Sequence, residues 1–144
     1  MPEGSDERGS TLLLVPSAVL VLFLLTALAV DAAASFLAQR ELADACAAAA
    51  NDADTVALDP GRLYGAGGPP GQDVDLDRAV AIAQSRAAPL AARWGQPVST
   101  RAEVDGPDVV LRLQGSAPLP IGPGGAGRTR VGITATCRST SVRR

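Results

Sequence analysis

The side chains that most often do chemistry in proteins are missing from this sequence. The chain has no His, and all 13 of its basic residues are Arg. Without an imidazole there is no base of the usual kind to activate a Ser or Thr hydroxyl, and without Lys there is no amine for Schiff-base chemistry. The net charge of -2 gives no electrostatic reason to expect nucleic acid as a partner. The composition therefore predicts no enzyme, no cofactor and no small-molecule substrate.

Two local patterns look like ligand sites but lack residues that the ligands need. Asp73, Asp75 and Asp77 alternate like the start of a calcium-binding loop. Such a loop continues with Gly at its sixth position and Glu at its twelfth, and this sequence does not. The Gly-rich segment 65–71 is followed by no Lys, so it does not match a phosphate-binding loop. We expect a solvated helix start at the aspartates and no metal site.

The two cysteines are the remaining reactive side chains. Cys46 borders a stripe of small residues on an Ala-rich helical segment, and Cys137 is in phase with Val131, Ile133 and Ala135 on a predicted strand. Both side chains are therefore expected to face the same interior. An oxidising compartment would let them form a Cys46–Cys137 disulfide. Two buried free thiols are the alternative, because Cys packs readily in cores.

An apolar segment must position the first of these cysteines. Leu12 to Val30 contains no charged residue and would be roughly 28 Å long as a helix. That length is close to the ~30 Å hydrocarbon core of a bilayer, so residues 12–30 are predicted to form a transmembrane helix after a short tail, 1–11. A cleaved signal peptide is the alternative, with Ala29 as its processing site at the end of a small-x-small sequence. The length of the run and its acidic N-terminal flank favour a retained helix.

Flanking charges encode the orientation only weakly. Arg8 precedes the span and Arg40 lies beyond it, so the positive-inside rule nearly balances. A short tail can remain inside while the larger part is exported, and a disulfide requires export. We therefore expect a single-pass protein of the cell membrane with a cytoplasmic N-terminus and an extracytoplasmic C-terminal domain.

Beyond the span, the helix is expected to continue over residues 31–58. Ala-rich sequence without Gly or Pro has high helix propensity. A narrow apolar stripe, with Cys46 beside it, predicts one packed face; its members are Ala38, Leu42, Ala45 and Ala49. A Gly- and Pro-rich loop, 59–74, ends the rod.

A second helix is predicted to begin at Asp75, a plausible N-cap. Pro89 is expected to kink this helix or to end it early. The helix carries an apolar stripe at steps of three and four residues. Its members are Leu76, Val80, Ala83, Ala87, Leu90 and Trp94.

Three segments that alternate with a period of two predict three strands in an antiparallel sheet. The side chains expected to face inward are Val98, Thr100, Ala102 and Val104, then Val109, Leu111 and Leu113, and finally Val131, Ile133, Ala135 and Cys137. A polar tail, 138–144, follows. The predicted fold is α+β and pilin-like: a long N-terminal helix whose first half spans the membrane, and a second helix packed on a three-stranded antiparallel sheet within residues 75–137.

This sequence resembles the tight-adherence (Flp) pilus assembly proteins of the TadE/TadG-like group. The resemblance rests on four segments: Asp6-Glu7-Arg8-Gly9-Ser10 before the apolar run, Ala29-Val30-Asp31 at its end, Arg40-Glu41-Leu42-Ala43-Asp44-Ala45 after it, and Ala117-Pro118-Leu119-Pro120 before the last strand. The first 55 residues carry most of the match. The resemblance implies a pilin-like, single-pass membrane protein.

It also implies a role in assembling a surface pilus or a related secretion apparatus, with other membrane subunits of that apparatus and membrane lipid as partners. The resemblance makes Gly9 a possible processing site for a prepilin peptidase. Precursors of that kind usually carry Glu at the fifth position after the cleaved Gly, where this chain has Leu14. The departure favours an accessory, anchored subunit over a main filament protein. A secreted binding module released after Ala29 and a general envelope scaffold are the alternative functions.

Overall fold

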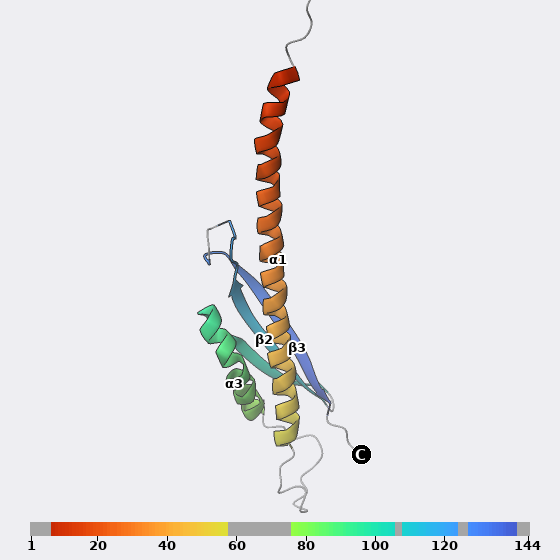
Figure 1. Cartoon of the computed structure of the whole chain (residues 1–144). Helices are drawn as coiled ribbons and strands as arrows, with labels where there is room; N and C mark the ends of the chain where they lie inside the picture. The colour runs from red at the N-terminus through yellow and green to blue at the C-terminus, as the bar shows by residue number, and fades with distance from the viewer. Residues whose placement is uncertain (1–6, 58–75, 106–107, 124–126, 141–144) are drawn as a thin grey trace, which may run out of the picture.

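The computed structural model describes residues 7–57, 76–105, 108–123 and 127–140. Along the chain these residues form α1 (Glu7–Ala57), α3 (Leu76–Trp94), β1 (Ser99–Asp105), β2 (Asp108–Pro118) and β3 (Arg130–Thr140). A long N-terminal helix, a second helix and a three-stranded antiparallel sheet confirm the predicted α+β class (Figure 1). The predicted loop 59–74, Asp73, Asp75 and the end of the tail at 141–144 lie outside the described residues.

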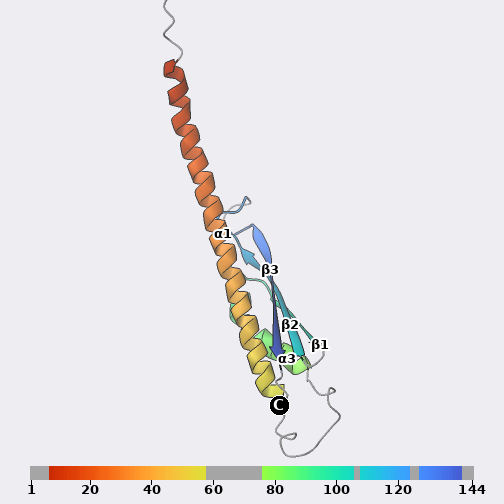
Figure 2. The same ribbon diagram turned by 90° about the vertical axis from the view of Figure 1, so that its right-hand side faces the viewer.

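Helix α1 has 51 residues and would be about 76 Å long at the usual rise. Its sequence is dominated by Ala and Leu, the residues that lose least conformational entropy in a helix. The helix begins at Glu7, several residues before the predicted start at Leu12. Only the C-terminal half of α1 packs against the other elements, and the N-terminal half extends away from them (Figures 1 and 2).

We predicted that Pro89 would kink α3 or end it early. The helix does not end there but continues to Trp94. Pro89 is exposed. The buried stripe of α3 also differs from the prediction. Leu76 and Val80 were expected to be buried but are only half-buried, and Ala79 is buried instead. Steps of three and four residues allow either position, and close approach to α1 favours the smaller side chain.

The sheet has the order β1-β2-β3, with both pairs antiparallel. Ala102 lies opposite Leu111 in the first pair, and Leu111 lies opposite Cys137 in the second. Side chains on this face of the sheet meet the helices, since α1 contacts β2 and β3 while α3 contacts β1 and β2. Arg112 and Thr136 lie on the opposite face and are exposed.

The core is built mainly from small residues. Of the residues predicted to face inward on β2 and β3, Val109, Leu111, Leu113, Ile133 and Ala135 are buried, which confirms the facing of both strands. The stripe on α1 is also confirmed. Its buried members on α1 are Ala38, Leu42, Cys46, Ala49, Ala50 and Ala53.

Two predictions about the sheet are wrong. Val104 was expected to face inward but is 48% exposed. It belongs to the edge strand β1, whose burial stops after Ala102. The polar tail was expected to start at residue 138, but β3 continues to Thr140, and Ser139 is buried.

Candidate functional site

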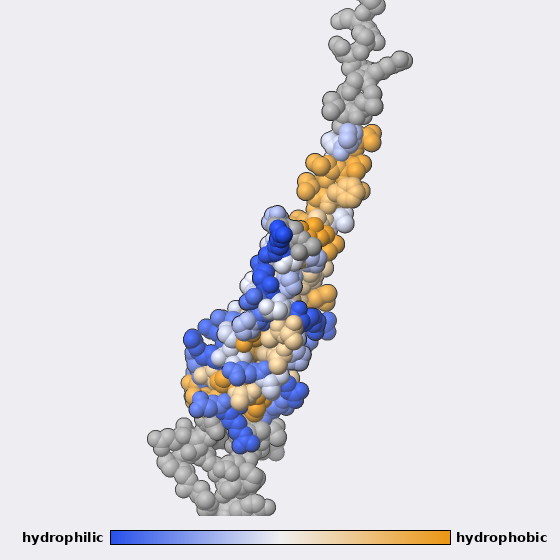
Figure 3. All heavy atoms as spheres, turned by 90° about the vertical axis from the view of Figure 1, so that its left-hand side faces the viewer, coloured by the Kyte–Doolittle hydropathy of each residue, from blue (hydrophilic) through white to orange (hydrophobic). Residues whose placement is uncertain are grey.

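The most unusual surface of the molecule is the N-terminal half of α1. Between Leu14 and Val30 every large apolar side chain is exposed, and Phe23 reaches 72%. The helix is long and apolar enough to cross a membrane, and its most apolar stretch buries nothing against the rest of the chain. In Figure 3 this part of α1 is a continuous hydrophobic surface that projects from a largely hydrophilic domain. A surface of this kind is strongly unfavourable in water and is favourable in hydrocarbon.

The polar groups inside this apolar half are satisfied within the helix. The Ser17 hydroxyl donates to the carbonyl oxygen of Leu14 at 2.9 Å, and the Thr26 hydroxyl donates to that of Leu22 at 2.8 Å. Such bonds remove the cost of placing a hydroxyl in lipid, where no water can replace the partner. The span therefore carries no polar side chain that needs a partner from outside.

The domain begins where the apolar half ends. At that level the Asp31 carboxylate accepts a hydrogen bond from the backbone N–H of Ile121, with 2.9 Å between Oδ1 and N. Ile121 lies between β2 and β3, and we call the described residues there, 119–123 and 127–129, the β2–β3 loop. In both ribbon views this loop is the part of the domain that reaches furthest toward the N-terminal half of α1 (Figures 1 and 2). A contact across 90 residues of sequence thus fixes the loop to the end of the span.

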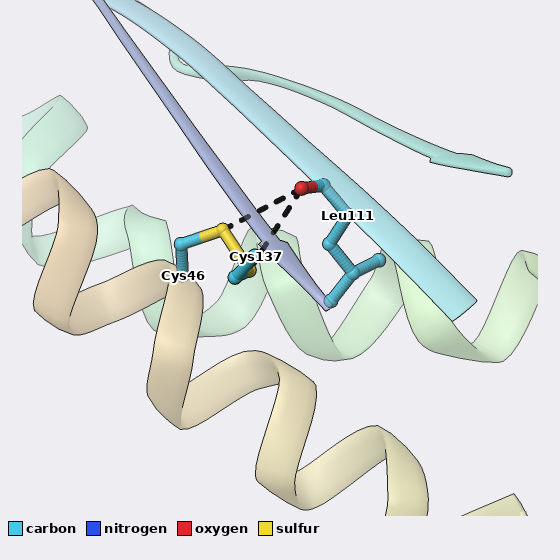
Figure 4. Close-up of a disulfide and its surroundings, with 3 residues drawn as sticks. All are labelled: Cys46, Leu111 and Cys137. Atoms are coloured by element: carbon cyan, nitrogen blue, oxygen red, sulfur yellow. Dashed lines mark hydrogen bonds between the residues drawn. A yellow bond between two sulfur atoms is a disulfide. The ribbon is translucent and has the colours of Figure 1, made fainter. Parts of the chain in front are cut away.

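The two cysteines, predicted to pair, are joined by a disulfide in the structure (Figure 4). Cys46 comes from α1 and Cys137 from β3, and their Cα atoms are 5.8 Å apart. The carbonyl oxygen of Leu111 lies 3.6 Å from Sγ of Cys46 and 3.8 Å from Sγ of Cys137. Neither sulfur carries a proton in a disulfide, so these are close contacts in which β2 packs over the bond.

Two ion pairs join the helices beside this core. Arg86 on α3 reaches Asp52 on α1 at 2.6 Å, and Arg93 reaches Glu41 at 2.6 Å. All four side chains are at least one third exposed, so solvent screens the attraction. We therefore ascribe the packing of α3 on α1 to the buried alanines and treat the ion pairs as setting its register.

The end of the sheet away from the span holds an ion-pair cluster that the sequence patterns did not reveal. Arg138 lies 3.0 Å from Asp108, the first residue of β2, and 2.7 Å from Asp105, the last residue of β1. They lie where β3 continues past the last predicted residue, paired with the start of β2. Alternation of apolar residues could not signal them, because the partners are all charged.

The structure places the two processing candidates inside α1. Gly9 lies in the first turn of the helix, and Ala29 lies near the end of its exposed apolar half. The domain draws on α1 only from Asp31 onward, so a chain cut at Ala29 would keep every buried residue of the core. Among the residues described, no group of three or more Cys, Asp or Glu side chains could hold a metal ion.

The functional arrangement is therefore a helix with two surfaces, one exposed and apolar and one packed into a disulfide-bonded domain. The sequence predicted both surfaces and the cysteine pair. It did not predict the contact between Asp31 and Ile121, which depends on a loop with no periodic pattern. Comparisons with protein-family models, with curated proteins and with solved structures found no match to this chain.

Proposed function

We propose that this chain is a membrane-anchored, pilin-like accessory subunit that helps to assemble a tight-adherence pilus or a related secretion apparatus. The observation that carries the proposal is the division of α1 into an exposed apolar half and a half that packs into the domain. Such a helix fixes a folded domain to the surface of a membrane. The chain acts by binding other subunits and performs no catalysis.

The membrane step rests on the physical chemistry of the exposed half. Exposing this many large apolar side chains to water is unfavourable, and the helix is long enough to cross the hydrocarbon core. The N-terminus is cytoplasmic and the domain is extracytoplasmic in this proposal. The disulfide between Cys46 and Cys137 supports that orientation, because disulfides persist outside the reducing cytoplasm.

The pilus step rests on the sequence resemblance together with the pilin-like architecture. In pilin-like proteins a long helix anchors the chain and its second half supports a sheet, which is also the arrangement here. The expected partners are other membrane subunits of the same apparatus. Genes for a secretion ATPase and its platform proteins beside this one, and co-purification of those subunits with the detergent-solubilised chain, would support the role. Normal pilus assembly in cells that lack the chain would leave a general envelope scaffold as the better description.

Alkaline extraction of membranes tests the anchor. The full chain should stay with the membrane, because its apolar half is held by hydrocarbon and not by charge. Replacing Leu22 and Leu25 together by Arg adds about 2.5–3.5 kcal/mol per residue at the centre of a span and should release the chain. The matched control is Gln84→Arg on the exposed side of α3, which should remain bound. Extraction of the unaltered chain would instead favour a secreted module cut after Ala29.

A further inference from the structure

We propose that the β2–β3 loop docks on the lipid headgroups of the membrane that α1 enters, with anionic lipid as its preferred surface. The inference rests on the proposed membrane anchor and adds a second contact between the domain and the bilayer. The observation that carries it is the hydrogen bond from the Ile121 N–H to the Asp31 carboxylate.

The depth of the loop follows from that bond. If residues 12–30 fill the hydrocarbon core, Asp31 lies where hydrocarbon gives way to the headgroup layer, which is about 5–8 Å thick on each side. Ile121 N is 2.9 Å from the Asp31 carboxylate, so its residue must lie within that layer. A domain on a flexible tether would be free of this constraint, whereas here α1 is one continuous helix through the boundary.

The exposed side chains at this level are apolar. Ile121 is 46% exposed. On the other side of α1, Phe36 and Leu37 are also exposed, at 67% and 57%. They lie about 7–9 Å beyond Asp31 along the axis, and helical side chains lean back toward the N-terminus, that is, toward the membrane. Apolar groups therefore surround the helix at the headgroup level.

The charge of the loop fits an anionic surface. Residues 117–131 contain no Asp or Glu and include Arg128 and Arg130. Arg130 donates to the backbone oxygens of Trp94 and Ser116, which holds it against the domain. Arg128 is exposed, and the hydrogen bonds between Leu119 and the residues on either side of Arg128 keep it beside the apolar tip. The Asp31 carboxylate at this level accepts the loop's own N–H.

Such docking would hold the domain in one orientation on the membrane. The β2–β3 loop would fix its near end while the disulfide fixes β3 to α1 further from the membrane. The exposed face of the sheet, which carries Arg112 and Thr136, would then be presented in a constant direction to other subunits.

Depth-dependent fluorescence quenching tests the proposal on the full chain in vesicles of phosphatidylcholine and phosphatidylglycerol. Both native cysteines are bonded, so a new cysteine is the only free thiol for an environment-sensitive dye. Three single variants are compared: Ile121→Cys in the loop, Leu22→Cys in the span and Ala81→Cys on exposed α3. Pro120→Cys, also exposed, is a second loop position in case the first disturbs packing.

At position 121 we expect blue-shifted emission relative to position 81 and loss of signal to spin-labelled headgroups. Both effects should weaken without phosphatidylglycerol, with Arg128→Gln, or with Asp31→Ala, which removes the acceptor for the loop. Water-like emission at 121 and 120 beside blue-shifted emission at 22 would overturn loop docking and leave the anchor standing. Water-like emission at 22 would overturn both the anchor and the docking.

Discussion

Single residues set limits on this fold, and Gly115 is one position where the space is narrow. A Cβ at position 115 would stand 2.9 Å from Cζ3 of the buried Trp94 ring, closer than carbon atoms pack. We expect Gly115→Ala to destabilise the domain by about 1–3 kcal/mol, because the ring cannot move aside without disturbing the core. Urea unfolding of the full chain in detergent, followed by circular dichroism, measures the change.

The matched control lies on the neighbouring strand. At Gly132 an added Cβ meets nothing within 4 Å. Gly132→Ala should therefore stay within about 0.5 kcal/mol of the unaltered chain, or stabilise it slightly by restricting the unfolded state. Equal losses in the two variants would show that the close approach of Gly115 to Trp94 is not what limits the position.

The disulfide between Cys46 and Cys137 is the second feature at the scale of single residues. It joins residues 91 apart in sequence, and the chain-entropy model gives about 4–5 kcal/mol for closing a loop of that size. A small domain has a total stability of about 5–15 kcal/mol, so replacing both Cys46 and Cys137 by Ala should bring it close to unfolding. Protease resistance with and without reductant measures this. A chain equally resistant in both conditions would rule out a stabilising role for the bond.

Among the elements, β2 is the central strand and carries two of the largest fully buried side chains, Leu111 and Leu113. Leu111 has no exposed surface, packs between the helices and its own sheet, and lies over the disulfide. Leu111→Ala should cost about 2–5 kcal/mol. Arg112→Ala, one residue along on the exposed face, should be nearly silent in the same protease assay. A similar loss from both changes would mean that the strand does not face as described.

The contact between α1 and α3 depends on small residues at close range. Ala83 is completely buried, whereas Ala92 on the same helix is exposed. Ala83→Leu should overpack the contact and cost about 1–3 kcal/mol, while Ala92→Leu should cost almost nothing. Arg93→Ala, which breaks the ion pair with Glu41, should cost less than about 1 kcal/mol. Thermal unfolding of the three variants ranks these effects, and a larger loss from Arg93→Ala than from Ala83→Leu would contradict an Ala-based contact.

The elements also show where sequence reasoning works and where it stops. Periodicity located the packed face of α1 and the facing of β2 and β3, because each of these buries one side only. Periodicity failed at Val104, because apolar and polar residues can alternate along an edge strand even where no helix covers the end of that strand. Periodicity also missed two contacts, the hydrogen bond between Asp31 and Ile121 and the close approach of Gly115 to Trp94. Each contact joins different elements of the fold through residues that belong to no repeating pattern.

At the scale of the whole molecule, one helix carries two different surfaces. Its N-terminal half exposes the apolar surface that hydrocarbon would cover, and its C-terminal half supplies the small residues around which the domain folds. The disulfide and the Asp31–Ile121 bond hold the domain against the second half of α1. Anchor and domain should therefore move as one body, which suits a subunit that presents a fixed surface to its neighbours.

The central claim is that the chain stays in the membrane through α1 with its domain in an oxidising compartment. The most direct measurement is the intact mass of the protein taken from alkaline-washed membranes and alkylated without reductant. We predict a membrane-bound species that retains Leu12 to Val30 and carries no alkylated cysteine. A soluble species that begins after Ala29, or one in which Cys46 and Cys137 are both alkylated, would contradict the claim.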